Sequence, residues 1–82
     1  MKREEIFSKT VEFIIANNKE IKKEQITMDS AFEDLNLDSL DLISIITDLE
    51  KQYNIVLSNE EVARIQNVSQ AIEVIEKHIA QN

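Results

Sequence analysis

The chain contains no cysteine, glycine or proline. Without cysteine it can form neither disulfide bonds nor thiolate metal sites, so its stability must come from packing. Glycine and proline supply most tight hairpin turns, and their absence argues against an all-β sandwich or barrel. A helical protein is therefore the default expectation.

Long apolar runs are also missing, since every run is far shorter than the roughly 20 residues that a membrane-spanning helix needs. The first residues, "MKREEIF", lack the apolar core of a signal peptide. We therefore expect no membrane insertion and a cytoplasmic location. A chain of 82 residues is too short for two independent cores, which predicts a single domain over residues 1–82.

Negative charge dominates one part of the sequence. The net charge is −7, and residues 28–65 hold nine acidic side chains against two basic ones, so this segment carries the whole excess. Such a balance disfavours nucleic acid and anionic membranes as partners. A solvated acidic surface explains the pattern, and so does a face that attracts a basic protein.

The spacing of apolar residues predicts four helices. The first covers residues 3–16. The second covers residues 39–53 and is so apolar that we expect it to be largely enclosed. A third helix of about two turns and a last helix begin at capping-box pairs, Ser58 with Glu61 and Asn67 with Gln70. The predicted fold is all-α: a small four-helix bundle of three major helices and a short third one, with a long loop between helices 1 and 2.

The long connection over residues 19–38 shows no sustained period, but apolar residues recur through it and predict contact with the core. A structureless loop of about 20 residues is unusual in a compact domain and suggests either a function or a wrong assignment. Ser30 and Glu33 have capping-box spacing, which predicts one local turn. Asn17 and Asn18 predict a left-handed end to the first helix.

Residues for catalysis and metal binding are scarce. A nucleophilic serine needs a nearby base, and the only histidine, His78, is predicted to lie in the last turn of the final helix, at its negative end. A calcium loop starting at Asp29 would place Ala31, Asp34 and Leu40 where oxygen ligands and a glycine are required. We therefore expect neither an enzyme nor a metal site.

The stretch "LNLDSLDLIS" places Ser39 between Asp38 and Asp41 at the start of the second helix. Asp38 as N-cap and Asp41 three residues later would complement the exposed amides and the helix dipole, and this local role alone explains both aspartates. A serine at this position also presents its hydroxyl beside amides that favour a phosphate group. Without a histidine, it is better suited to being modified than to acting as a nucleophile.

Residues 26–68 resemble the acyl carrier proteins. The shared pattern is an "IT.D..F..L" approach, the "DSLD" start, a second helix ending in "LE..Y.I.L", and then "EE...I..V". The resemblance implies the same small bundle with its long first loop. It also implies that Ser39 receives 4′-phosphopantetheine from a phosphopantetheinyl transferase, the holo-carrier synthase, and that acyl groups are carried on it as thioesters.

The resemblance further implies a monomeric carrier that delivers acyl groups to acyl-transfer enzymes, ketosynthases or related enzymes of fatty-acid or polyketide-type synthesis. Basic patches on these partners would meet a docking face formed by Asp38, Leu40, Asp41, Asp48, Glu50, Glu60 and Glu61. Other positions line a pocket for the acyl chain in the family: Leu42, Ile46, Leu49, Val62 and Ile65. Solvated surface and plain core packing explain the two sets equally well.

Three residues depart from the family pattern. Asn36 replaces a common glycine and is tolerable where the backbone is left-handed. Ser44 replaces a frequent glutamate and Lys51 interrupts the acidic run, which leaves room for a specialised pathway. Two alternatives stay open: a carrier for amino acids of the peptidyl or D-alanyl type, and an unmodified acidic helical adaptor that binds a basic protein through residues 38–61.

Overall fold

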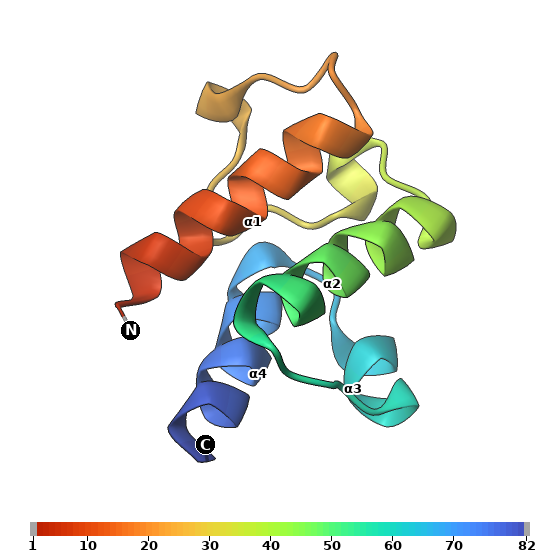
Figure 1. Cartoon of the computed structure of the whole chain (residues 1–82). Coiled ribbons are helices and arrows are strands. Elements are labelled where there is room, and N and C mark those ends of the chain that lie inside the picture. Colours follow the sequence, from red (N-terminus) through yellow and green to blue (C-terminus); the bar gives the residue numbers. More distant parts are fainter. Residues whose placement is uncertain (1, 82) are drawn as a thin grey trace.

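The computed structural model describes residues 2–81 and contains four α-helices in that range (Figure 1). The bounds are α1 Arg3–Asn17, α2 Ser39–Tyr53, α3 Asn59–Arg64 and α4 Val68–Gln81. The predicted all-α bundle with a short third helix is confirmed, and the predicted bounds of the first two helices agree to within one residue. Helices α1, α2 and α4 form the main bundle, and α3 lies at its edge.

Capping boxes fix where three of the helices begin, as predicted. The side chain of Asp38 accepts a hydrogen bond from the amide of Asp41 (2.9 Å), and Ser58 does the same for Glu61 (3.1 Å). Asn67 Oδ1 accepts from the amide of Gln70 at 2.9 Å. These bonds satisfy amides that have no partner inside the helix, so the start of each helix follows from local sequence.

Asparagine takes the place of glycine at two left-handed positions. Asn36 has φ 59° and Asn54, which ends α2, has φ 55°. Asn36 thus has the left-handed backbone under which asparagine is tolerable in place of glycine. The same expectation at the end of α1 is wrong, because Asn18 is extended with φ −147°. There the amide of Asn18 donates to the carbonyl of Ile14 at 3.0 Å, and the side-chain amide of Asn17 donates to the carbonyl of Phe13 at 2.9 Å.

The loop between α1 and α2 contains two 3₁₀ turns, Lys23–Gln25 and Glu33–Leu35. The second of these is the local turn predicted from Ser30 and Glu33, although no side chain caps it and the capping box does not form. Ser30 Oγ accepts from the amide of Thr27 at 2.9 Å, while its backbone carbonyl accepts from Val68 at 3.0 Å. Contact with a distant part of the chain therefore decides the geometry at Ser30.

That distant part is the junction between α3 and α4. Besides the Val68 bond, the amide of Phe32 donates to the carbonyl of Gln66 (3.0 Å) and the amide of Ser69 donates to that of Met28 (2.9 Å). Ala31 and Asn67 form an isolated antiparallel bridge. The loop is also anchored in the core by the buried side chains of Ile21, Ile26, Phe32, Leu35 and Leu37. It is a fixed part of the fold, as its recurring apolar residues predicted.

Helix α2 is less enclosed than its composition suggests. Its buried residues are Ile45, Ile46 and Leu49, whereas Leu40 is 75% exposed and Ile43 is 52% exposed. The prediction of a largely enclosed helix is therefore wrong. Only one stripe of α2 packs against the core. Helix α3 has only six residues and no buried side chain, so it covers little of the remaining surface of α2.

Candidate functional site

Ser39 is the first residue of α2 and its side chain is exposed. The preceding residue, Asp38, is extended (φ −86°, ψ −178°) and brings the loop to the helix. Asp41 completes the capping box, since its carboxylate accepts from the amide of Asp38 at 3.3 Å. The local roles predicted for both aspartates are confirmed. The Ser39 hydroxyl consequently stands at the positive end of a rigid helix, where a phosphate group is favoured.

A hollow of about 490 Å³ lies directly beside Ser39. Three of its lining residues, Phe32, Leu37 and Ile65, are buried apolar residues. Its polar lining residues come from three separate stretches of the chain. The complete lining is Ala31, Phe32, Glu33, Leu37, Asp38, Ser39, Leu42, Ile65 and Gln66.

A second hollow of about 330 Å³ lies further along α2, between that helix and the start of α3. Its lining residues are Ile43, Ile46, Thr47, Glu50, Leu57, Asn59, Val62 and Ala63. The five residues predicted to form one acyl pocket are divided by the structure. Leu42 and Ile65 line the hollow beside Ser39, and Ile46 and Val62 line the second one. Leu49 lies in the core, 1% exposed, and lines neither.

The seven residues predicted for docking differ in their solvent exposure and in whether backbone amides already bind their carboxylates. Asp38, Leu40 and Glu60 are exposed, while the other four are half-buried. Glu50 is held by the protein itself, because its Oε2 accepts from the amide of Leu57 at 2.8 Å. Glu61 is similarly held, since its Oε1 accepts from the amide of Ser58 at 2.9 Å. An acidic residue in the sequence is therefore not always an acidic group available at the surface.

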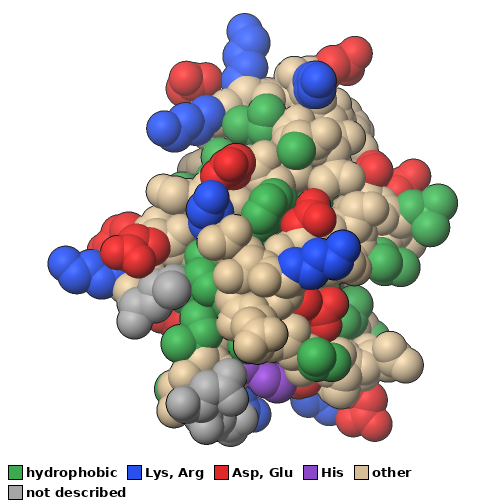
Figure 2. Space-filling view, viewed as in Figure 1, with side chains coloured by type: hydrophobic (Ala, Val, Ile, Leu, Met, Phe, Trp, Pro, Cys, Tyr) green, Lys and Arg blue, Asp and Glu red, His purple; other side chains and the backbone are tan. Residues whose placement is uncertain are grey.

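His78 makes a contact that the sequence did not reveal. It lies in the last turn of α4, as predicted, but its Nε2 is 2.9 Å from Glu61 Oε2 and 3.1 Å from Glu61 Oε1. The pKa of Glu61 is lowered to about 2, first by the backbone hydrogen bond from Ser58 and then by the hydrogen bond from His78. Figure 2 shows this imidazole, the only histidine, at the surface in the lower part of the molecule.

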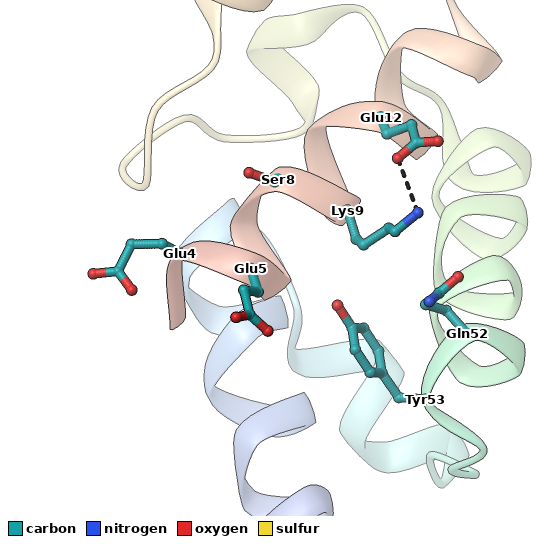
Figure 3. Close-up of a pocket in the computed structure, with 7 residues that line it drawn as sticks. All are labelled: Glu4, Glu5, Ser8, Lys9, Glu12, Gln52 and Tyr53. Atoms are coloured by element: carbon teal, nitrogen blue, oxygen red, sulfur yellow. Dashed lines mark ion pairs between the residues drawn. The ribbon is translucent and has the colours of Figure 1, made fainter. Parts of the chain in front are cut away.

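A third hollow, of about 460 Å³, lies between α1 and the far end of α2 (Figure 3). Tyr53 projects into it, and burial raises the pKa of the tyrosine together with the negative charge of Glu5. The nearby Lys9 is paired with Glu12 at 3.2 Å. A rise of 1.5 Å per residue puts Tyr53 roughly 21 Å along the helix axis from Ser39. This hollow is therefore separate from the site at Ser39.

Residues 2–81 contain no group of three or more metal-binding side chains. Within the same range, no helix is long and apolar enough to cross a membrane.

Comparison with known proteins connects this geometry to a family. The family model described as the phosphopantetheine attachment site matches residues 9–75. The chain is 40% identical over 74 residues to an acyl carrier protein of Cyanidium caldarium, covering 89% of this chain and 85% of the relative. It is 43% identical over 67 residues to an acyl carrier protein of Brachyspira hyodysenteriae, covering 79% and 86%.

A third relative is an acyl carrier protein of Lactobacillus acidophilus, 37% identical over 79 residues, which covers 95% of this chain and 98% of the relative. The chain belongs to the phosphopantetheine attachment family, and within it to the acyl carrier proteins. Proteins of this family are carriers, and their prosthetic group is 4′-phosphopantetheine. The resemblance inferred from the sequence is confirmed.

Proposed function

We propose that residues 1–82 form one carrier domain in which Ser39 bears 4′-phosphopantetheine, and that this carrier delivers acyl thioesters to enzymes of fatty-acid or polyketide-type synthesis. The observation that carries the proposal is the position of Ser39. Its side chain is exposed at the first turn of α2 and lines a hollow together with the buried apolar residues Leu37 and Ile65.

The residues around Ser39 fit the group. The N-terminus of α2 favours the phosphate through its amides and dipole. The adjoining hollow offers apolar surface from Leu42 and Ile65 and polar atoms from Gln66, which suits a chain that is partly apolar and partly amide. When bound, phosphopantetheine supplies a thiol at the end of a flexible arm, and an acyl group is activated there as a thioester.

The chain's own residues supply attachment, orientation and docking. The Ser39 hydroxyl forms the phosphodiester bond and loses its proton, while the nucleotide part of coenzyme A leaves. The capping box formed by Asp38 and Asp41 holds the first turn in place. A tether of fixed length then keeps the acyl group at a high effective concentration near the active sites of successive enzymes.

Docking rests on the exposed residues near Ser39. Leu40, at 75% exposed, offers an apolar contact beside the carboxylates of Asp38 and Asp41. We assign Asp48, Glu50, Glu60 and Glu61 to the same face. Backbone amides already bind the carboxylates of Glu50 and Glu61, as they bind those of Asp38 and Asp41, so Asp48 and Glu60 offer the freer charges. Exposed charge pairs of this kind are weak and screened by salt, which suits a carrier that must leave each partner quickly.

Intact mass after co-expression with a broad-specificity phosphopantetheinyl transferase tests the attachment. The expected result is a gain of one phosphopantetheine that disappears in Ser39→Ala and persists in Ser44→Ala, a matched variant of an exposed serine on the same helix. If the transferase modifies a control carrier but leaves this chain unchanged, the carrier proposal is wrong and the adaptor is favoured. Loading of the modified chain with fatty acid, compared with D-alanine, then distinguishes an acyl carrier from an amino-acid carrier.

A further inference from the structure

The hollow between α1 and the far end of α2 has an aromatic wall with a carboxylate beside it. Its volume of about 460 Å³ lies within the range of ordinary ligand pockets. The half-buried ring of Tyr53 extends from α2 toward α1, and Glu5 lies next to it (Figure 3). Burial and then the negative charge of Glu5 raise the pKa of Tyr53, so the carboxylate is close enough to act on the phenol. An aromatic face beside a carboxylate suits a flat, positively charged occupant.

The basic side chains near this hollow already have partners. Lys9 lines the hollow, but its Nζ is paired with Glu12 Oε2 at 3.2 Å. Arg3 is bound to Glu76 on α4 at 2.7 Å. Among residues 2–81, which the structure describes, no basic side chain forms an ion pair with Glu5. Three glutamates and one lysine line the hollow, which leaves a charge balance of −2 for a cation from another molecule.

Arginine is the protein cation that best fits these two walls. Its guanidinium is planar, so it stacks on the face of Tyr53 while its fork of N–H groups binds both oxygens of Glu5. A lysine ammonium is a compact, strongly hydrated point charge and gains less from an aromatic face. The two walls stand on α1 and α2, and both helices bury apolar residues in the core. The distance between the helices is therefore fixed before any partner binds.

An apolar groove adjoins this hollow on the other side of α1. Its volume is about 210 Å³, and Phe7, Val11 and Ile15 line it from a single stripe of the helix. Ser8 and Glu12 line both the hollow and the groove, so they form the ridge between them. A helix with its side chains is about 10–12 Å across. One partner segment that fills both sides therefore needs two anchoring side chains roughly 10 Å apart, which is the distance between residues i and i+7 of an α-helix.

We propose that the hollow and the groove together form a second docking surface, and that its occupant is a basic α-helix of a partner protein. This helix places an arginine beside Tyr53 and an apolar side chain between Phe7 and Ile15, and the charge balance of −2 makes the surface complementary to it. The surface goes beyond the proposed function, because it lies roughly 21 Å along α2 from Ser39. A partner bound there leaves the serine free, so one protein can hold the chain while another reaches Ser39.

Titration of the unmodified, isotope-labelled protein with a helical peptide tests this surface by NMR. The probe is a helix of alanine and glutamine with one arginine placed seven positions before one leucine. We expect saturable shifts of the amides of Ser8, Gln52 and Tyr53, while those of Ser39 and Leu40 stay unchanged. Replacing the arginine by neutral citrulline should weaken binding on the order of two- to fivefold, the range of an exposed cation–π contact, and replacing the leucine by alanine should also weaken it. Equal shifts at every exposed carboxylate, or equal affinity for arginine amide alone, would overturn the proposal.

Variants of the protein test the two walls of the hollow. Glu5→Gln removes an exposed carboxylate without touching the core, and we expect it to weaken binding of the arginine peptide on the order of two- to fivefold. Tyr53→Leu should have a similar effect, whereas Tyr53→Phe keeps the aromatic face and should bind as the wild type does. Asp29→Asn is the matched control, because it removes an exposed negative charge outside both the hollow and the groove. Wild-type affinity in Glu5→Gln or Tyr53→Leu, or an equal loss in Asp29→Asn, would overturn the proposal.

Modification of Ser39 in the presence of the peptide tests whether the two surfaces are separate. The phosphopantetheinyl transferase should modify the chain at the same rate with saturating arginine peptide as with the same concentration of citrulline peptide. A slower reaction with the arginine peptide alone would contradict a docking surface that leaves Ser39 free. A chain that is not modified at all would defeat the proposed function but leave the titration result standing.

Discussion

The contact between α1 and α4 and the seam between α2 and α3 are built in different ways. Residues that face the core from the first pair are completely buried, including Ile6, Ile72 and Ile75. Helix α3 contributes no buried residue and is held by hydrogen bonds at its ends and by the contact between Glu61 and His78. The difference teaches that the fold combines a completely buried core with a less buried wall along α2. Three comparisons test this division, beginning with the largest expected effect.

Truncation of a core residue should separate the two regions most clearly. Ile72→Ala removes a side chain that is 0% exposed in α4, and we expect a loss of about 2–5 kcal/mol in the free energy of unfolding. Val62→Ala in α3 should cost about 1 kcal/mol or less, because that valine is only partly buried. Urea denaturation of both variants measures the losses. Equal losses would mean that α3 belongs to the same cooperative core as α4.

Removal of the helix caps should cost less stability than truncation of a core residue, and it again compares α4 with α3. Asn67→Ala and Ser58→Ala remove equivalent side-chain acceptors, from α4 and α3 respectively. The loss of such a cap typically costs about 0.5–2 kcal/mol. We expect the α4 variant to show this cost in the urea midpoint and the α3 variant to show less than half of it, because α3 can fray without opening the core. A larger loss for Ser58→Ala would reverse the comparison.

Acidification should produce the smallest effect. The pKa of Glu61 is about 2 in the folded protein, below the ordinary 4.5, so its stabilising contribution is complete above about pH 4.5 and is lost as the pH falls toward 2. The melting temperature of the wild type should therefore fall more between pH 5 and pH 2.5 than that of Glu61→Gln. Parallel curves for the two proteins would show that this carboxylate does not couple α3 to stability.

Local signals in the sequence predicted a large part of this molecule. The capping boxes at Asp38, Ser58 and Asn67 depend on residues three positions apart, and the left-handed Asn36 depends on its own backbone, so each could be read without tertiary structure. The residues of the motif around Ser39 are likewise contiguous in the sequence, so the motif could be recognised without tertiary structure. These features explain why the bounds of the helices and the family were predicted correctly.

Features that depend on distant contacts were missed. The exposure of Leu40 and Ile43 follows from how little of α2 the short α3 covers, and composition alone does not show this. Glu61 and His78 are 17 residues apart and meet only because α3 packs beside α4. The division of the predicted pocket into two hollows has the same origin, because it depends on where α3 rests against α2.

The bridge between Ala31 and Asn67 bears on how the serine is recognised. It joins the first loop to the junction of α3 and α4, and the hollow beside Ser39 is lined from both of these regions as well as from α2. The proposed attachment site is therefore a surface assembled from three stretches of the chain. A synthetic peptide copied from residues 35–44 would keep the motif and lose the surface that surrounds it.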